Sequence, residues 1–304
     1  MEEIKPAFSQ NNVPIVFSAN DNYVPMLGVE IASIIKSSSP KNNYDIVILM
    51  TNISSENKVK LLSLISTHQN FSIRFVNVGP YIYGYNFFLE SDITNTKYSD
   101  EIYFRVLVPA LMPSYEKVIF LDADLIVLDD VAKLLKAANN TDMINAVRDY
   151  EGIANCYNNN YERTKYRISE IGIDQFDKYF ISGVIVMNTR LFNEKFSAKE
   201  LLDFAVSKNW KQLDQDLLNH LCKGSVNIID AAWDFVEDIY GVYHSMPKHL
   251  FDEYVKSEEK PKIIHYSAKR KPWINISSKY NIPFWEIANT TVFADELKLK
   301  INND

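Results

Sequence analysis

Two aspartates interrupt a run of apolar residues between Lys117 and Leu128. The segment reads KVIFLDADLIVL and is predicted to be a strand over Lys117–Leu128, although Asp122 and Asp124 fall where a buried strand would end. Two carboxylates about 5 Å apart in a partly buried site repel each other by roughly 3 kcal/mol at an effective dielectric of about 20. A hard divalent cation relieves that repulsion, and such an ion commonly bridges a substrate diphosphate. The pair predicts a metal site; the alternative is a strand that ends at Leu121, with both aspartates solvated in a loop.

A second segment near the C-terminus offers a further metal ligand and cationic side chains. In IIHYSAKRKPW, His265 comes before a basic run of three residues, 269–271. Imidazole is a good ligand for Mn²⁺, and a local cluster of cations suits a diphosphate. The formal net charge of −7 argues against a nucleic-acid partner, which normally requires a basic face. Together the two segments favour a site for a metal ion and a diphosphate that is built from both of them. Lys269 and Arg270 would then serve only to make the electrostatic field at the site positive.

Short motifs of other enzyme classes do not occur in the sequence. The eight glycines form neither the G-x-G-x-x-G of a dinucleotide site nor the G-x-x-x-x-G-K-[ST] of a P-loop. There is no G-x-S-x-G elbow, and Ser182 has no evident partner base nearby in the sequence. One other enzyme class stays open, because haloacid-dehalogenase-like phosphatases also end a strand with D-x-D. Their motif usually lies on the first strand and wants Thr or Val where this chain has Ile126.

The elements that must position these residues alternate between strands and helices in the first half of the chain. Three apolar segments, VPIVFSA, YDIVILMT and FSIRFVNV, are predicted strands. Residues 20–38 and 54–66 carry apolar side chains at helical spacing, and a serine cap opens the second segment. Apolar strands separated by helices predict an α/β fold, with a mainly parallel, Rossmann-like central sheet flanked by helices.

The second half of the chain is less regular. The pattern predicts strands over 142–150 and 178–189. Residues 150–178, rich in Tyr, Asn and charge, are predicted to form a long loop or lid. The tail is predicted to be helical after Pro283. Because no repeat or low-complexity linker interrupts the chain, we expect one continuous domain with a C-terminal helical extension.

Cysteine content and hydropathy bear on the compartment. The chain has two cysteines, Cys156 and Cys222, and its first residues lack the apolar core of a signal peptide. No run approaches the roughly 18 apolar residues of a membrane span. We expect a cytoplasmic protein with free thiols and no integral membrane segment; peripheral association with the inner face of the cell membrane is the alternative.

Six segments resemble the retaining glycosyltransferases of family 8, which have the GT-A fold. They occur in the order found in that family and extend from residue 15 to residue 273. The six segments are IVFSANDNYVPML, IYFRVLVPALMP, VIFLDADLIV, YFISGVIVMN, LDQDLLN and HYSAKRKPW.

The resemblance implies a metal ion and a nucleotide-sugar donor. Asp122, Asp124 and His265 would bind Mn²⁺, with Mg²⁺ as the alternative ion. The ion would hold the diphosphate of a UDP-sugar, and Lys271 would hold its β-phosphate. The residues implied to act in catalysis are Arg105, Asp214, Gln215 and Lys271. Those implied to bind the cofactor and donor are Ser18, Ala19, Asn20, Asn22, Tyr23, Arg105, Asp122, Ala123, Asp124, Ser182, Gly183, Asp214, Gln215, His265, Ala268 and Lys271.

Within that set the resemblance implies separate roles. Residues 18–23 would surround the uridine, with Tyr23 stacking on uracil or packing partly against the sheet. Residues 182–183 and 214–215 would frame the donor sugar, although Asp214 could instead cap a helix. Asp149 stands where the family often has an acid near the acceptor.

Three positions depart from the family pattern. Asn20 replaces a carboxylate that commonly contacts uracil, and its amide can still hydrogen-bond the base. Ile181 replaces the usual Asn of an N-[AS]-G triplet, which removes a polar contact to the sugar. Ala268 stands at a glycine position, where a methyl group would hinder close approach of the backbone to phosphate.

The sequence therefore predicts a Mn²⁺-dependent retaining glycosyltransferase. It would move galactose or glucose from a UDP-sugar to a glycan, glycolipid or glycoprotein acceptor. Residues 1–275 would form the catalytic domain, with 13–128 binding the nucleotide-sugar, 129–275 forming the sugar and acceptor part, and 276–304 as the extension. The alternatives are the phosphatase and a non-catalytic protein that binds sugar nucleotides.

Overall fold

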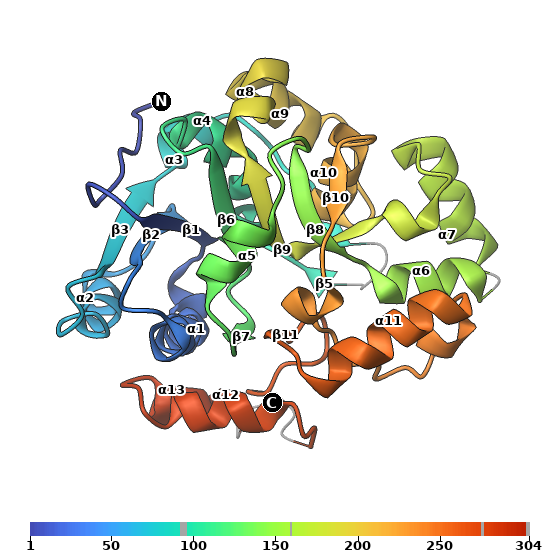
Figure 1. Ribbon diagram of the computed structural model, residues 1–304. Coiled ribbons are helices and arrows are strands. Elements are labelled where there is room, and N and C mark those ends of the chain that lie inside the picture. Colours follow the sequence, from blue (N-terminus) through green and yellow to red (C-terminus); the bar gives the residue numbers. More distant parts are fainter. Residues whose placement is uncertain (92–95, 159, 275–276, 302–304) are drawn as a thin grey trace.

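The computed structural model describes residues 1–91, 96–158, 160–274 and 277–301. Its central sheet has seven strands in the order β10-β8-β9-β6-β1-β2-β3 (Figure 1). Strand β9 runs antiparallel to its neighbours β6 and β8, and all other adjacent pairs are parallel. The predicted mainly parallel sheet is confirmed. The seven strands are β1 (Asn12–Ser18), β2 (Asn43–Met50), β3 (Phe71–Asn77), β6 (Lys117–Leu121), β8 (Ile144–Arg148), β9 (Phe180–Asn188) and β10 (Val226–Ile228).

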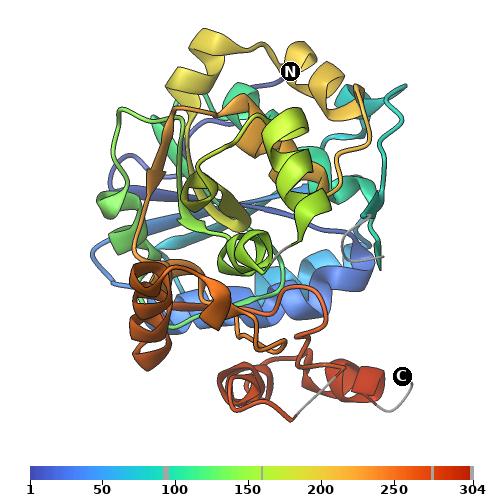
Figure 2. The same cartoon turned by 90° about the vertical axis from the view of Figure 1, so that its right-hand side faces the viewer.

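Helices cover both faces of the sheet (Figures 1 and 2). Successive strand side chains point to opposite faces, so Ile15 and Phe17 of β1 lie in one apolar core and Val16 in the other. The helices that contribute to the first core are α1 (Val24–Ser37), α2 (Ser55–Ser63), α5 (Val131–Ala137), α6 (Tyr150–Tyr157), α11 (Lys248–Glu259), α12 (Asn281–Ala288) and α13 (Ala294–Ile301). Those that contribute to the second core are α3 (Gly79–Ile82), the 3₁₀ helix η2 (Asp100–Leu107), α4 (Val108–Leu111), α7 (Tyr161–Tyr166), α8 (Thr189–Lys195), α9 (Ala198–Val206) and α10 (Leu213–Leu221).

The predicted strand from Lys117 to Leu128 is wrong as a single element. Strand β6 ends at Leu121, and β7 (Leu125–Val127) leaves the central sheet to pair antiparallel with β11 (Ile263–His265). A further short pair joins β4 (Glu90–Ser91) to β5 (Thr96–Lys97). The chain turns at residues 122–124 because two carboxylates are costly between apolar sheet neighbours, whereas the turn lets them face a cavity.

The loop or lid predicted for residues 150–178 is also wrong, because the described part of this segment is mostly helical. Asp149 caps α6 by accepting the N–H of Gly152 at 2.8 Å, and Asn160 caps α7 by accepting the N–H of Arg163 at 3.1 Å. Asp and Asn favour helix caps and loops alike, so composition alone did not separate the two. Two short elements follow α7, the π-helical turn η3 (Arg167–Ile171) and the 3₁₀ turn η4 (Phe176–Lys178).

The C-terminal segment is helical and packs against α1, below the sheet in Figures 1 and 2. Phe293 and Leu297 are fully buried there. A Cβ atom added at Gly28 of α1 would lie 2.1 Å from the Phe293 ring, so the glycine makes room for the aromatic side chain. The predicted helical extension is confirmed, while the division of the chain at residue 275 stays a prediction.

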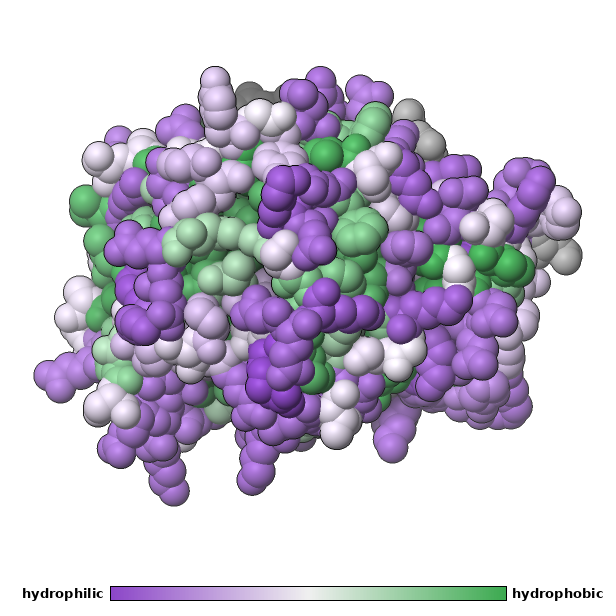
Figure 3. Space-filling model, turned by 90° about the horizontal axis from the view of Figure 1, so that it is seen from above, coloured by the Kyte–Doolittle hydropathy of each residue, from purple (hydrophilic) through white to green (hydrophobic). Residues whose placement is uncertain are grey.

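The molecular surface is mixed in character. Seen from above, hydrophilic residues dominate, and apolar residues lie in separate patches among them (Figure 3). Within the described ranges, no helix has the length and apolar character needed to cross a bilayer.

Candidate active site

The cavity lies where the strand order changes direction. Strand β1 has β2 on one side and β6 on the other, so the carboxyl ends of β1 and β6 border a crevice of the kind that binds ligands in open α/β sheets. A cavity of about 490 Å³ occupies this place. Every residue predicted above to act in catalysis or to bind metal or donor lines it, together with Asp149 and Ile181. The fold brings these residues together, and their individual roles stay predictions.

Asp122, Asp124 and His265 converge at one end of the cavity. Each offers a ligand atom, and these atoms lie within 4.8 Å of one another. The register of β11 with β7 places His265 opposite Leu125, next to Asp124. Oδ1 of Asp124 is buried without a hydrogen-bond partner, which is costly unless a ligand uses it. Two carboxylates, one of them with an oxygen that accepts no hydrogen bond, and an imidazole fit Mn²⁺ or Mg²⁺.

His265 is held by a residue that the sequence did not reveal. Its Nδ1 lies 2.8 Å from Oδ1 of Asp234, at the end of the 3₁₀ turn η5 (Ala231–Asp234), and Oδ2 of Asp234 accepts the N–H of Val184 at 3.1 Å. Burial opposes a charged imidazolium, but Asp234 and Asp124 outweigh it and raise the pKa of His265 to about 10. No local motif marks Asp234, because its importance depends on what lies beside it in the fold.

Gly183 lies directly under the His265 ring. A Cβ atom at this position would come within 2.2 Å of Cε1 of His265. The steric demand of His265 therefore explains a glycine in the ISG segment, independently of any contact to a sugar.

Each of the two aspartates already forms an ion pair with a cationic side chain. Nη2 of Arg105 is 2.5 Å from Oδ1 of Asp122, and the ammonium of Lys271 forms an ion pair with Asp124. Burial opposes ionisation of Asp124, but Lys271 and His265 hold the pKa of its carboxyl well below the usual range. The site thus keeps the Asp124 carboxyl charged and holds Asp122 in an ion pair before an ion arrives.

Arg105 also connects this cluster to Asp214. Its Nη1 lies 3.1 Å from Oδ2 of Asp214 and donates to the Ser182 carbonyl at 2.7 Å. Burial, with Asp122 nearby, outweighs Arg105 and raises the pKa of Asp214 to about 6. The capping alternative for Asp214 is wrong, because α10 begins at Leu213 and has no side-chain cap.

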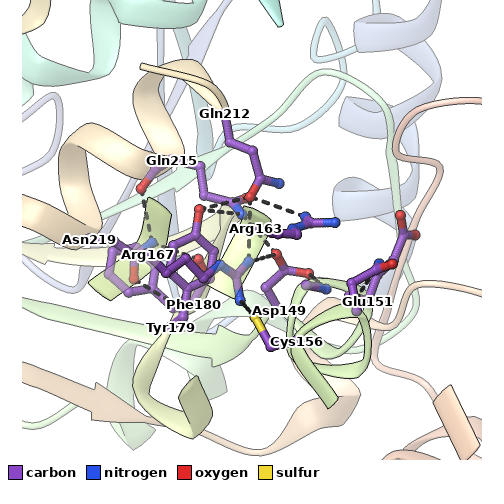
Figure 4. A network of polar contacts seen from close by, with 12 residues as sticks. Asp149, Glu151, Cys156, Arg163, Arg167, Tyr179, Phe180, Gln212, Gln215 and Asn219 are labelled. Atoms are coloured by element: carbon purple, nitrogen blue, oxygen red, sulfur yellow. Dashed lines mark hydrogen bonds and ion pairs between the residues drawn. The ribbon is translucent and has the colours of Figure 1, made fainter. Parts of the chain in front are cut away.

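Gln215 connects Ser182 to Asp149 across the cavity wall. Its Oε1 accepts the N–H of Ser182 at 3.2 Å, and its Nε2 donates to Oδ2 of Asp149 at 3.1 Å. Asp149 also pairs with the buried Arg167 at 3.3 Å, and the Arg167 guanidinium lies 3.6 Å from the centre of the Tyr179 ring (Figure 4). The amide orientation of Gln215 is therefore set by partners on both sides.

The residues predicted to surround uridine lie at the end of β1. Asn20 accepts the N–H of Asn22 at 3.1 Å and donates to Glu101 at 3.2 Å, so a carboxylate stands beside this amide. The Tyr23 side chain is 38% exposed and lines the cavity, which leaves part of the ring free for a ligand. Burial, with Asp124 and Asp122 nearby, raises the pKa of Tyr23 to about 12.

The loop 267–271 differs from the prediction in one respect. Arg270 does more than add positive field: it is buried, pairs with Glu151 at 2.6 Å and donates to the Glu237 carbonyl at 2.6 Å. Lys269 is exposed. Ala268 has a φ of 52°, in the left-handed region that favours glycine.

Further lining residues were not predicted from the sequence. Several come from α6, α7 and the turn before α10, on the side of the cavity away from the aspartates. Some of these residues flank Asp149 in the segment VRDYEG. Their closeness to Asp149 in the sequence was the one local feature that could have indicated them. The residues added by the structure include Arg148, Tyr150, Glu151, Arg163, Gln212, Tyr243 and Arg270.

Comparison with known proteins agrees with this arrangement. The family model "Glycosyl transferase family 8" matches residues 14–277. A lipopolysaccharide 1,2-glucosyltransferase of Escherichia coli is 25% identical over 63% of this chain and 54% of its own length. The WbbM bifunctional glycosyltransferase superposes with a TM-score of 0.85 at 27% identity, covering 98% of this chain and 53% of that one. The galactosyltransferase LgtC, in complex with donor and acceptor sugar analogues, gives a TM-score of 0.73 at 22% identity and covers 92% of this chain and 96% of that one.

The chain belongs to glycosyltransferase family 8 and has the α/β architecture of GT-A enzymes. It spans about half the length of the Escherichia coli relative and of the WbbM chain. Family membership sets aside the phosphatase alternative. The motif also lies on β6, which is not the first strand of the sheet.

Proposed function

We propose that the chain is a Mn²⁺-dependent retaining glycosyltransferase that moves galactose or glucose from a UDP-sugar to a hydroxyl of a glycan, glycolipid or glycoprotein. The observation that carries this proposal is the convergence of Asp122, Asp124 and His265 beside Lys271 at the carboxyl ends of β1 and β6. Mg²⁺ is the alternative ion. The names of the Escherichia coli relative and of LgtC, a glucosyltransferase and a galactosyltransferase, support a hexose donor.

We assign the binding of the nucleotide-sugar to residues 13–128 and the sugar and acceptor part to 129–275, with 276–304 as an extension. In this division Tyr23 offers its partly exposed ring to uracil. Asn20 and Glu101 together provide an amide and a carboxylate beside it. Ile181 lines the cavity next to Ser182 and presents no polar group to a sugar hydroxyl.

Departure of UDP is the step that these residues favour. Asp122, Asp124 and His265 would hold a divalent ion, which would supply positive charge to the diphosphate of the leaving group. Lys271 adds a positive charge on the same wall, and Arg105 holds Asp122 in place through an ion pair. Charge placed before the reaction stabilises the transition state more than the ground state.

Retention is best explained by front-face attack of the acceptor hydroxyl, with its proton passing to a phosphate oxygen of the leaving group. Gln215 is an amide and a poor nucleophile, and both its polar atoms are already engaged. Asp214 is paired with Arg105. Asp216 accepts hydrogen bonds from Tyr166 and Tyr179 and does not line the cavity.

The test is release of UDP from UDP-galactose and UDP-glucose, with and without Mn²⁺. We expect Mn²⁺-dependent turnover of one donor, and a loss of roughly a hundredfold or more in Asp124→Asn, because charge stabilisation at the leaving group is removed. Asp129→Asn is the matched control, since Asp129 lies five residues on and pairs with Lys133 at the surface. Absence of turnover with UDP still bound would favour the non-catalytic alternative. No effect of Asp124→Asn would contradict the proposed site.

A further inference from the structure

The acceptor side of the cavity is built largely from arginine and carboxylate pairs. Asp149 pairs with Arg167 at 3.3 Å, and Glu151 pairs with Arg270 at 2.6 Å. On the same side, Arg148 pairs with Glu253 at 2.6 Å. Each of these carboxylates therefore has its own guanidinium, so the charges on this wall largely cancel.

Arg163 is the exception on this wall. It lines the cavity from α7, and no carboxylate among the described residues lies within ion-pair distance of it. Its Nη2 donates only to the neutral amide oxygen of Gln212, at 3.2 Å. Figure 4 shows its side chain beside Gln212, on the same side as Asp149. A full positive charge thus stands in the cavity with a neutral partner.

Part of the hydrogen-bonding capacity of Arg163 is also unused. Its Nε is buried and has no hydrogen-bond partner, which is unfavourable for a buried donor. No hydrogen bond is formed by its Nη1 to another described residue, and this atom is not among the buried ones. The guanidinium therefore lines the cavity with donors that no described residue uses.

The position of Arg163 separates it from the donor diphosphate. The cations at the metal end, Arg105 and Lys271, are engaged by Asp122 and Asp124. Arg163 contacts neither of these aspartates and instead joins the Gln212, Arg167 and Asp149 network beyond Gln215. A ligand that meets Arg163 is thus bound next to the donor sugar, where an acceptor must lie.

We propose that the acceptor carries an anionic group, a carboxylate or a phosphate on a sugar, which is bound by Arg163. This inference rests on the proposed transferase function and names the acceptor class for the same cavity. A guanidinium binds either anion through paired N–H donors, so the chemistry is shared by uronic acids and sugar phosphates. A neutral sugar hydroxyl would leave the positive charge uncompensated.

The experiment compares matched sugars by saturation-transfer NMR on protein saturated with UDP and Mg²⁺, a diamagnetic ion, so that the diphosphate end is filled. The pairs are methyl galacturonide against methyl galactoside and methyl glucuronide against methyl glucoside, with glucose 6-phosphate as the phosphate probe. We expect the charged member to bind roughly five- to tenfold more tightly, with the difference shrinking at high salt.

Three variants test whether Arg163 causes the tighter binding of the charged sugar. Arg163→Gln should abolish this preference. Arg163→Lys should restore part of the preference, because a charge without the paired donors remains. Arg190→Gln, at an exposed pair with Glu194 on α8, should leave it unchanged. Equal binding of charged and neutral members, or a preference that survives Arg163→Gln, would overturn the proposal.

Two further measurements distinguish a failure of this inference from a failure of the transferase function on which it rests. Binding of UDP is measured by calorimetry first, and its absence would count against the transferase function. The sugar titrations are also run without UDP, so they decide the acceptor question in either case. If UDP-glucuronate binds more tightly than UDP-glucose in an Arg163-dependent way, the anion belongs to the donor and the acceptor assignment is wrong.

Discussion

Asp234 determines how His265 can act as a ligand. Because its carboxylate faces Nδ1, the other ring nitrogen, Nε2, points toward Asp124 at 3.5 Å. A buried carboxylate behind a histidine orients the ring and selects the tautomer that binds a metal. Both oxygens of Asp234 are used, one by His265 and the other by the Val184 N–H.

Replacing Asp234 by Asn tests this role. Asparagine has one acceptor oxygen, so it cannot satisfy both His265 and the Val184 N–H. We expect Mn²⁺ affinity to fall about ten- to a hundredfold, measured by electron paramagnetic resonance with UDP present. Asp252→Asn, at an exposed pair with Lys248, should have no effect. Unchanged Mn²⁺ affinity in Asp234→Asn would show that His265 needs no such support.

Ala268 shows how a departure from the family pattern is accommodated. Its φ of 52° is a conformation that costs an alanine roughly 1–2 kcal/mol, whereas a glycine adopts it freely. The loop keeps this backbone because Arg270, two residues on, is anchored by Glu151 and the Glu237 carbonyl. The methyl group is tolerated at the expense of local strain.

At the scale of elements, α1 connects the C-terminal helices to the metal site. Ser33 of α1 accepts the N–H of Val127 in β7 at 2.9 Å, and β7 begins directly after Asp124. On another side of α1, Phe293 fills the space above Gly28. The C-terminal helices therefore pack against α1, and α1 in turn holds β7 in place.

This packing predicts coupled effects on the free energy of unfolding. We expect Phe293→Ala to lower it by about 3–5 kcal/mol and Gly28→Ala by about 1–3 kcal/mol, measured by urea denaturation. In the double variant the alanine at 28 no longer meets a ring, so the loss should be smaller than the sum. Val292→Ala, 62% exposed beside Phe293, should change stability by less than about 0.5 kcal/mol. Simple additivity would mean that Gly28 and Phe293 do not interact.

At the scale of the whole molecule, partial or full burial raises the pKa of many tyrosines. Burial raises the pKa of Tyr44 to about 12, and that of Tyr23 to about 12 with Asp124 and Asp122 adding to it. Burial is the main cause of a raised pKa at other tyrosines, which are Tyr103, Tyr115, Tyr150, Tyr166, Tyr179, Tyr243, Tyr254, Tyr266 and Tyr280.

These shifts predict a cooperative alkaline transition. Because the pKa values are higher in the folded than in the unfolded chain, the stability they contribute is complete below about pH 10 and is lost as pH rises through about 12. Tyrosinate absorbance should therefore appear together with loss of the circular dichroism signal. In concentrated guanidinium chloride the same absorbance should rise near pH 10. Gradual ionisation with the dichroism intact beyond pH 12 would contradict this expectation.

Much of the fold followed from local sequence properties. Apolar strands alternating with amphipathic helices predicted the α/β class and the mainly parallel sheet, because side-chain periodicity is a property of each segment alone. The same kind of information misplaced the end of β6 and missed α6 and α7. Strand pairing decides where β6 stops, and capping side chains resemble loop residues.

The sequence by itself determined the ligand types, since two carboxylates, a histidine and a basic run are chemistry that can be recognised without a fold. Only the tertiary structure decided which groups stand beside them. Asp234 meets His265 and Glu151 meets Arg270, although each pair comes from different elements. Among the described residues, no carboxylate pairs with Arg163. The reason is physical: contacts between distant segments depend on strand order and register, which set the position of every segment relative to the others.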